Sequence, residues 1–403
     1  MTFKSKLYNL FSLSIVEQLT LNGGNFLFFI LSAKMVGPLE FAKFSILWMG
    51  SQIIISISIP WISLPITSKN IDLGNKNIIL NALKKIAYLS LLTPVLLILY
   101  SYFVDEKLEI LEIILMYILG ILLVFFDTLR FFLVRNRAVK EALFCNLMKW
   151  VFAFILLGSF LGEAIYEDYQ IIFTGILLGT LIGVISQVLL IKPYFLKLKK
   201  NSIKNENELD MPLFHLGISN LSNSVFMTIL FIKIDLIVFG ALQAFRSLAN
   251  FFPFILQYIE SHYSAELIKK RKTEFITNKF LTYYFFICFL IILSFYFIAE
   301  DLINIIFGES YGEFKDIFIY LSMIIFIQSL SRLINVQNRL QNKNKVFNQS
   351  ALVLWGSTLG YAYFYNSTEN INSNSILLIM LCTSIFQLIL YLNATKKLGR
   401  YTN

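Results

Sequence analysis

The chain has 403 residues, of which 57% are hydrophobic and 15% charged, and its formal net charge is +9. This composition excludes a water-soluble domain of any size, because apolar stretches of about 20 residues follow one another almost without interruption. Only α-helices and closed barrels satisfy backbone hydrogen bonds in lipid, and the stretches lack the alternation of barrel strands. The sequence therefore predicts an all-α integral membrane protein.

About twelve membrane helices are expected, since each stretch can cross a bilayer core about 30 Å thick. In chain order they are Leu10–Ala33, Phe44–Ile66, Ile86–Val104, Leu108–Phe126, Ala142–Leu161, Tyr169–Ile191, Met211–Ile232, Ser247–Leu267, Phe280–Ala299, Phe314–Ile334, Val346–Phe364 and Ser375–Leu392. Only a short connection around Gly240 separates the seventh from the eighth.

The longest break in hydrophobicity, Lys192–Asp210, divides the chain into predicted six-helix bundles at 1–200 and 201–403 around a central cavity. The two halves begin alike, with Asn9-Leu-Phe-Ser-Leu-Ser-Ile and Pro212-Leu-Phe-His-Leu-Gly-Ile. A weak internal repeat is typical of transporters built from two related bundles. Chance similarity is the alternative, because phenylalanine and leucine are abundant.

Lysine and arginine collect in alternate loops, which predicts both termini in the cytoplasm. The exceptions are Lys34 and Lys43. This basic excess is the signature of membrane insertion, so no nucleic-acid partner is expected. The abundance of Ile, Phe, Asn and Lys suggests a bacterial source, hence the bacterial cytoplasmic (inner) membrane. The cysteines all fall within predicted helices, which argues against a disulfide framework.

Several polar side chains interrupt the predicted helices, and each needs a reason at membrane depth. In the first helix Glu17 is a candidate proton or cation site, with Asn22 and Asn25 as polar cavity lining. The alternative is a buried carboxylate paired with a neighbouring helix. Asp127 and Arg130 are expected to form an ion pair at the cytoplasmic edge, because residues three apart share one helix face.

Four cations are candidates for a substrate-binding cavity: Lys149, Lys233, Arg246 and Arg332. Asp235 is a second candidate for ion coupling. Gln328, Arg332, Asn335 and Arg339 recur at helical spacing, which predicts either a cavity-lining face or a helix end beyond the bilayer. The buried charges lean cationic, so we expect an anionic cargo such as a phosphate or pyrophosphate.

The three glycines Gly175, Gly179 and Gly183 recur at four-residue spacing on one helix face. Small residues at this spacing let two helices approach closely, so the pattern predicts helix packing rather than a ligand site.

Two segments resemble known proteins. Phe29-Ile-Leu-Ser-Ala-Lys-Met-Val-Gly-Pro-Leu-Glu-Phe-Ala-Lys-Phe is similar to the end of helix one and the following loop in polysaccharide (O-antigen or capsule repeat-unit) flippases. Those proteins belong to the multidrug, oligosaccharidyl-lipid and polysaccharide exporter superfamily. Ile306-Phe-Gly-Glu-Ser-Tyr-Gly-Glu-Phe resembles their element between helices nine and ten. The connection at Leu236–Arg246 is shorter than the family pattern.

The resemblance implies a flippase that moves undecaprenyl-pyrophosphate-linked oligosaccharides by alternating access, coupled to an ion gradient. Its partners would be the lipid-linked oligosaccharide, membrane lipid and other proteins of glycan assembly, as in lipopolysaccharide synthesis. No cofactor or metal is expected, since no nucleotide-binding loop occurs.

Three alternatives stay open. The first is a cation-coupled multidrug exporter of the same superfamily. The second is an enzyme, either a polysaccharide polymerase or an acyltransferase, although the chain lacks a large extracytoplasmic loop and a recognisable histidine motif. The third is a scaffold for glycan assembly.

Overall fold

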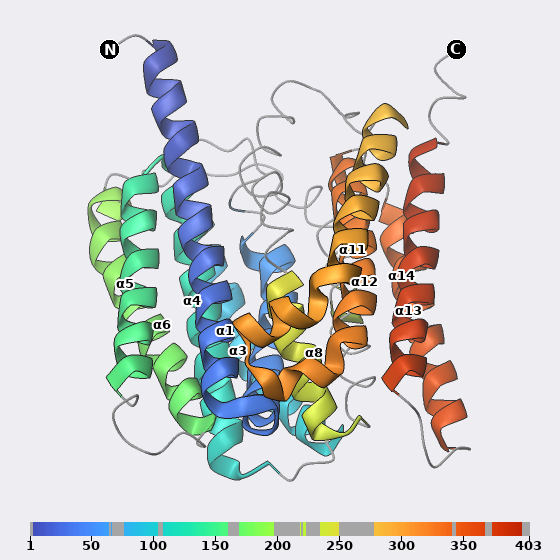
Figure 1. Ribbon diagram of the computed structural model, residues 1–403. Coiled ribbons are helices and arrows are strands. Elements are labelled where there is room, and N and C mark those ends of the chain that lie inside the picture. Colours follow the sequence, from blue (N-terminus) through green and yellow to red (C-terminus); the bar gives the residue numbers. More distant parts are fainter. Residues whose placement is uncertain are drawn as a thin grey trace, which may run out of the picture. The chain divides into compact units, whose positions relative to one another are not determined.

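The computed structural model describes residues 3–63, 66, 76–103, 108–159, 169–196, 218, 221–222, 234–249, 278–340, 344–366 and 373–396 (Figure 1). Every regular element among them is helical. The α-helices are α1 (Phe3–Ser58), α3 (Lys76–Phe103), α4 (Ile110–Arg135), α5 (Val139–Ser159), α6 (Tyr169–Leu196), α8 (Leu236–Ala249), α11 (Asn278–Ile306), α12 (Lys315–Leu340), α13 (Asn344–Asn366) and α14 (Ser373–Lys396). A π-helical turn, η1 (Ile59–Ser63), follows α1, and a 3-10 turn, η4 (Glu309–Phe314), precedes α12.

The predicted all-α membrane fold with about twelve helices is confirmed. Within the described residues, 8 helical stretches are long and apolar enough to cross a membrane, so this is a multi-pass membrane protein. The first stretch, Leu13–Ser63, has 51 residues and contains two of the predicted helices. Almost all of the predicted helix Met211–Ile232, and Ser247–Leu267 beyond residue 249, lie outside the described residues.

A break inside α1 separates its two membrane helices. Gly37 has φ 72° and ψ 175°, and Pro38 follows it. A positive φ strains any residue with a Cβ, and proline has no N–H to donate to the carbonyl four residues earlier. The Gly-Pro pair therefore ends one helix and begins the next, as the sequence predicted for this segment.

The outer surfaces of several helices are apolar. On α11, large hydrophobic side chains such as Phe286, Phe289 and Phe297 are exposed, and on α3 the same holds for Leu91 and Tyr102. Exposed apolar faces of this extent are unfavourable in water. Lipid is the solvent that suits them, which agrees with the membrane assignment.

The chain forms two compact units, which we describe separately. Unit 1 comprises Met1–Phe28 and Phe44–Ser224, and unit 2 comprises Phe29–Lys43 and Val225–Asn403. The boundary at Phe28 falls inside α1, so one continuous helix leaves unit 1 and enters unit 2. The division into six-helix bundles at 1–200 and 201–403 stays a prediction.

In unit 1, α5 and α6 pack closely through the glycines of α6. A Cβ on Gly179 would lie 2.6 Å from the backbone oxygen of Lys149, and a Cβ on Gly183 would lie 2.7 Å from the Phe126 ring. At Gly175 the nearest atom, the backbone oxygen of Ala153, is 3.6 Å away. The predicted packing role is confirmed at Gly179 and Gly183, whereas Gly175 makes only ordinary contacts.

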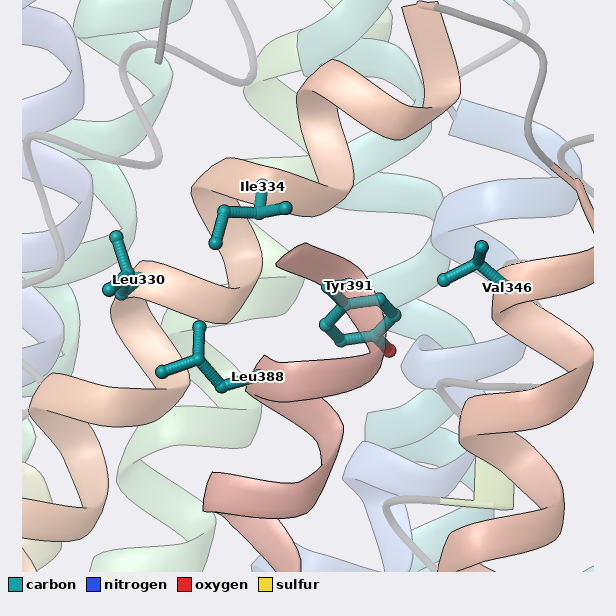
Figure 2. Packing of buried hydrophobic residues seen from close by; sticks show 5 residues of the cluster. All are labelled: Leu330, Ile334, Val346, Leu388 and Tyr391. Atoms are coloured by element: carbon teal, nitrogen blue, oxygen red, sulfur yellow. The ribbon is translucent and has the colours of Figure 1, made fainter. Parts of the chain in front are cut away.

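In unit 2, α12, α13 and α14 enclose an apolar cluster shown in Figure 2. Leu330 and Ile334 come from α12, Val346 from α13, and Leu388 and Tyr391 from α14. The hydroxyl of Tyr391 donates a hydrogen bond to Oγ of Ser350 on α13. Because this polar group has a partner, the tyrosine ring can lie among aliphatic side chains.

The segment that the sequence analysis interpreted as a short connection is a helix, α8, of 14 residues. Asp235 begins it, because its Oδ1 accepts hydrogen bonds from the backbone N–H groups of Ile237 (2.9 Å) and Val238 (3.4 Å). Gly240 does not interrupt the helix. A Cβ there would collide with the backbone oxygen of Pro38, so the glycine permits a close approach of two backbones within unit 2.

Candidate functional site

A buried polar cluster in unit 1 joins α1, α4 and α5. Arg130 donates from Nε to Oε1 of Glu17 at 2.5 Å and from Nη2 to Oε2 at 3.0 Å. Nη2 also donates to Oε1 of Gln18 at 2.5 Å, and Nδ2 of Asn146 donates to Oε1 of Glu17 at 2.8 Å. Glu17 is 0% exposed and Arg130 only 3% exposed. The carboxylate is thus held by three donors inside the helix bundle.

This arrangement explains how two charges lie inside a helical bundle. An isolated buried charge costs several kcal/mol or more, whereas a two-pronged arginine–carboxylate pair with further hydrogen bonds offsets most of that cost. Of the two interpretations open for Glu17, the structure shows the paired carboxylate. Its ion-coupling role stays a prediction.

The predicted ion pair between Asp127 and Arg130 is wrong, because Arg130 pairs with Glu17 instead. The two residues share a face of α4, but the arginine side chain reaches across to Glu17 on α1. Helix periodicity identifies neighbours on one helix and cannot reveal a better partner on another. Asp127 is half-buried and interacts electrostatically with Arg130, Lys149 and Glu17.

Lys149 belongs to the same region. It lies on α5, is 4% exposed, and directs its Nζ at the faces of two aromatic rings: 4.9 Å from the Phe126 centroid and 4.6 Å from that of Trp150. Glu17, Asp127, Arg130 and Lys149 therefore give two negative and two positive charges. This cluster is balanced in charge, and the cationic excess expected over the predicted helices as a whole stays a prediction.

Several buried polar atoms of unit 1 have no hydrogen-bond partner in the described structure. Among them are Nδ2 of Asn22, Oδ1 of Asn146, Nε1 of Trp150, and both Nε2 and Oε1 of Gln187 on α6. Buried polar groups are nearly always satisfied in folded proteins, by water if not by protein. These atoms mark where water or a polar ligand would be bound. In the described part of the chain, no group of three or more His, Cys, Asp or Glu could hold a metal.

Unit 2 has a polar network of a different kind, built from neutral side chains on α12, α13 and α14. Its hydrogen bonds join Gln328 to Ser384 (3.2 Å), Gln387 to Ser350 (2.9 Å), Tyr391 to Ser350 (2.5 Å) and Thr383 to Ser357 (3.1 Å). Of these residues the sequence analysis named only Gln328. The spacing of Thr383, Ser384 and Gln387 in an otherwise apolar helix was the signal that could have found the α14 side.

The remaining predicted site residues are dispersed. Arg332 is exposed on α12, Asn335 is half-buried with an unpartnered Oδ1, and Asn25 is exposed on α1. Arg246 is half-buried in the last turn of α8, and Asp235 is the exposed residue that caps the start of that helix. Lys233 lies outside the described residues.

The two segments that carry the sequence resemblance meet within unit 2. Tyr311, in η4, is buried and donates its hydroxyl to the backbone oxygen of Ala33 at 3.0 Å. Lys34 donates to the backbone oxygen of Ile305 at 3.2 Å. Lys43 pairs with Glu40 at 2.9 Å. The two lysines that departed from the charge pattern thus both have local partners.

No protein-family profile matches this sequence, and no curated protein matches it either. Solved structures do match. A multidrug resistance MATE family transporter of the MOP superfamily, in an outward-facing conformation, aligns with TM-score 0.65 and 13% identity over 98% of this chain and 96% of that one. A MATE protein in a bent conformation gives TM-score 0.62 at 13% identity, covering 98% and 96%. The eukaryotic MATE transporter AtDTX14 gives 0.57 at 11%, also covering 98% and 96%.

These alignments cover nearly the whole of each chain. Their sequence identities are low, so they establish a shared fold and nothing more. The protein therefore has the fold of these MATE transporters.

Proposed function

We propose that this chain is an alternating-access transporter of the bacterial cytoplasmic membrane that exports amphipathic organic solutes, as a multidrug exporter does. The observation that carries the proposal is a MATE fold along the whole chain combined with a buried, charge-balanced cluster inside unit 1. Paired charges at membrane depth are rarely retained for stability, because apolar residues would serve as well, so they point to transport chemistry. The proposed topology has both termini in the cytoplasm.

Alternating access needs two bodies that keep their own packing while the path between them changes. The chain supplies two compact units, each with its own apolar core and polar network. The substrate-binding roles of Arg246, Arg332 and Lys233 and the coupling role of Asp235 remain proposals within this scheme.

Coupling to an ion gradient is assigned to Glu17. A proton on this carboxyl would remove the counter-charge of Arg130, which would then depend on Asp127, three residues away on the same helix. Each protonation would change the charge balance of the cluster by one unit. A charge change at this depth is strongly unfavourable unless the environment rearranges, which is how a proton can drive a conformational step.

The second candidate is a flippase for lipid-linked oligosaccharides. It is favoured by the resemblance of the segments at 29–44 and 306–314. Its partners would be the lipid-linked oligosaccharide, membrane lipid and proteins of glycan assembly.

Two measurements on a deletion strain separate these functions. The first is the minimal inhibitory concentration of a panel of lipophilic cations and neutral amphiphiles, with and without the complementing gene. The second is the leaflet in which complete lipid-linked repeat units accumulate. Hypersensitivity of the deletion strain that is reversed by the wild-type gene, but not by Glu17→Gln, supports the exporter. Repeat units trapped in the cytoplasmic leaflet without hypersensitivity would replace it with the flippase.

A further inference from the structure

The ammonium group of Lys149 occupies an aromatic site of unit 1. Its Nζ lies 4.9 Å and 4.6 Å from the ring centroids of Phe126 and Trp150. Cation–π attraction operates within about 6 Å of a ring centroid and strengthens where water is excluded. Lys149 is 4% exposed, so both contacts are desolvated. The two rings attract this ammonium group through the same cation–π interaction that aromatic ligand sites use to bind small organic cations.

Lys149 has no close carboxylate partner. The ion pairs among the described residues do not include it. Asp127, which lies on α4 next to Phe126 in the sequence, attracts it electrostatically, and Arg130 on the same helix repels it more weakly. The ammonium is thus bound by two ring faces and one nearby negative charge, without a direct salt bridge.

Glycines on neighbouring helices fix the two rings. Gly24 of α1 faces Trp150 so closely that a Cβ would collide with the indole. Gly183 of α6 faces Phe126, and a Cβ there would lie 2.7 Å from that ring and 3.1 Å from the Cβ of Lys149. The Trp150 ring also packs against Phe28 with centroids 6.0 Å apart. Ring positions set by backbone contacts on two sides would persist if the lysine were shortened.

The charges around Lys149 determine which ligands the site would bind if the ammonium group were removed. Arg130 hydrogen-bonds Glu17 directly and also attracts Asp127, so these three groups together carry one net negative charge, which Lys149 balances. Removing the ammonium would leave two aromatic faces beside a group of side chains with one net negative charge. That combination favours a monovalent organic cation and disfavours an anion or a neutral solute.

We propose that Phe126, Trp150 and Asp127 form a binding site for primary alkylammonium ions, and that the side chain of Lys149 is a tethered cation that keeps this site filled. The wild-type protein excludes exogenous cations from this part of unit 1, and shortening the lysine opens the site to them. Lys149 is therefore a specificity-determining residue for cations. Its charge is engaged with the rings and unavailable to an anionic cargo unless it moves.

Binding to the purified full-length protein in detergent tests this proposal. Lys149→Ala is titrated with ethylammonium and n-butylammonium chloride, and the thermal unfolding midpoint is followed, because a ligand that binds the folded state raises it. We expect a saturable rise for the alanine variant, with an apparent affinity at least tenfold tighter than for the wild type. Uncharged n-butanol at the same concentrations produces no such rise. If the alanine protein is not recovered folded, Lys149→Val uncovers the same rings and takes its place.

Three matched variants define the site. Lys149→Arg refills it with another cation and should gain no binding. Asp127→Asn added to Lys149→Ala should lower the gained affinity at least tenfold. Lys315→Ala, which removes the partner of the exposed Glu300, controls for the loss of one positive charge at an exposed position. Alkylammonium binding that is absent from Lys149→Ala, unaffected by Asp127→Asn, or equal in Lys315→Ala would overturn the proposal.

The outcome does not depend on the exporter proposal. Binding is measured without a membrane gradient or a cargo, so a protein that fails every transport assay can still show the gained cation site. A working exporter can equally fail to show it.

Discussion

At the scale of single residues, the main feature is the pair formed by Glu17 and Arg130. Removing one partner leaves the other charged and buried, and breaking such a pair costs about 3–5 kcal/mol. We therefore expect Arg130→Met to lower the stability of the purified protein by about that amount, measured as the free energy of unfolding by denaturant in mixed micelles.

A double-mutant cycle separates the pair from its surroundings. Glu17→Gln together with Arg130→Met removes both charges, so the double variant should be more stable than Arg130→Met alone. Additive losses, with the double variant at the sum of the two single variants, would show that the two charges do not depend on each other.

The limits of sequence analysis are clearest at this scale. It identified Glu17 and Lys149 as unusual, because charge inside an apolar stretch is visible in one dimension. It could not identify Arg130 as the partner of Glu17, since the two are 113 residues apart and the nearer Asp127 was the obvious candidate. It also missed Gln187 and Ser350, because an isolated neutral polar residue in a membrane helix gives no indication of which face it occupies.

At the scale of helices, hydropathy was sufficient to predict most of the helices, since a stretch of about 20 apolar residues has few structures other than a helix available to it in lipid. The missed element is α8. Gly240 was interpreted as part of a connection, whereas it lies inside a helix whose only peculiarity is a close neighbour at Pro38. A glycine required by packing and a glycine that breaks a helix are identical in sequence.

The contact between α5 and α6 gives a prediction at this scale. Gly179→Ala should destabilise the protein by about 1–3 kcal/mol, because the new methyl group meets the backbone of α5. Gly175→Ala is the matched control. Its methyl group would meet its nearest atom at 3.6 Å, an ordinary contact, so it should be neutral or slightly stabilising. Equal effects of the two substitutions on thermal unfolding would contradict the packing described for Gly179.

The break inside α1 gives a second stability prediction at the scale of helices. Gly37→Ala introduces no collision, since nothing lies within 4 Å of the new Cβ, but it forces a Cβ onto a residue with φ 72°. With ψ at 175° the residue lies in a region that is essentially restricted to glycine, so the expected cost is about 1–3 kcal/mol from backbone strain alone. Gly356→Ala also meets nothing within 4 Å but lies in the regular helix α13, so it should raise stability slightly. A Gly37→Ala protein as stable as Gly356→Ala would argue against the described backbone at Gly37.

At the scale of the whole molecule, the distribution of lysine and arginine predicts the topology in the membrane. Lys140 and Glu309 are both exposed, and they belong to a basic and an acidic region respectively. In a background with Cys145, Cys288 and Cys382 replaced by alanine, Glu309→Cys should react with a membrane-impermeant thiol reagent in intact cells. Lys140→Cys should react only after the membrane is opened. The reverse pattern would invert the proposed orientation and place both termini outside.

The hydroxyl of Tyr311 donates to the backbone oxygen of Ala33, about one turn before the break at Gly37 and Pro38, and so ties η4 to the end of that helix. The broken helix and the tyrosine therefore depend on each other, although 278 residues separate Ala33 from Tyr311. A substitution at Tyr311 would then change the selection that acts on the Gly-Pro pair, and the reverse holds as well. Among descendants of a common ancestor, loss of the tyrosine should accompany loss of the Gly-Pro pair, so the two segments would be inherited as a single character rather than as two.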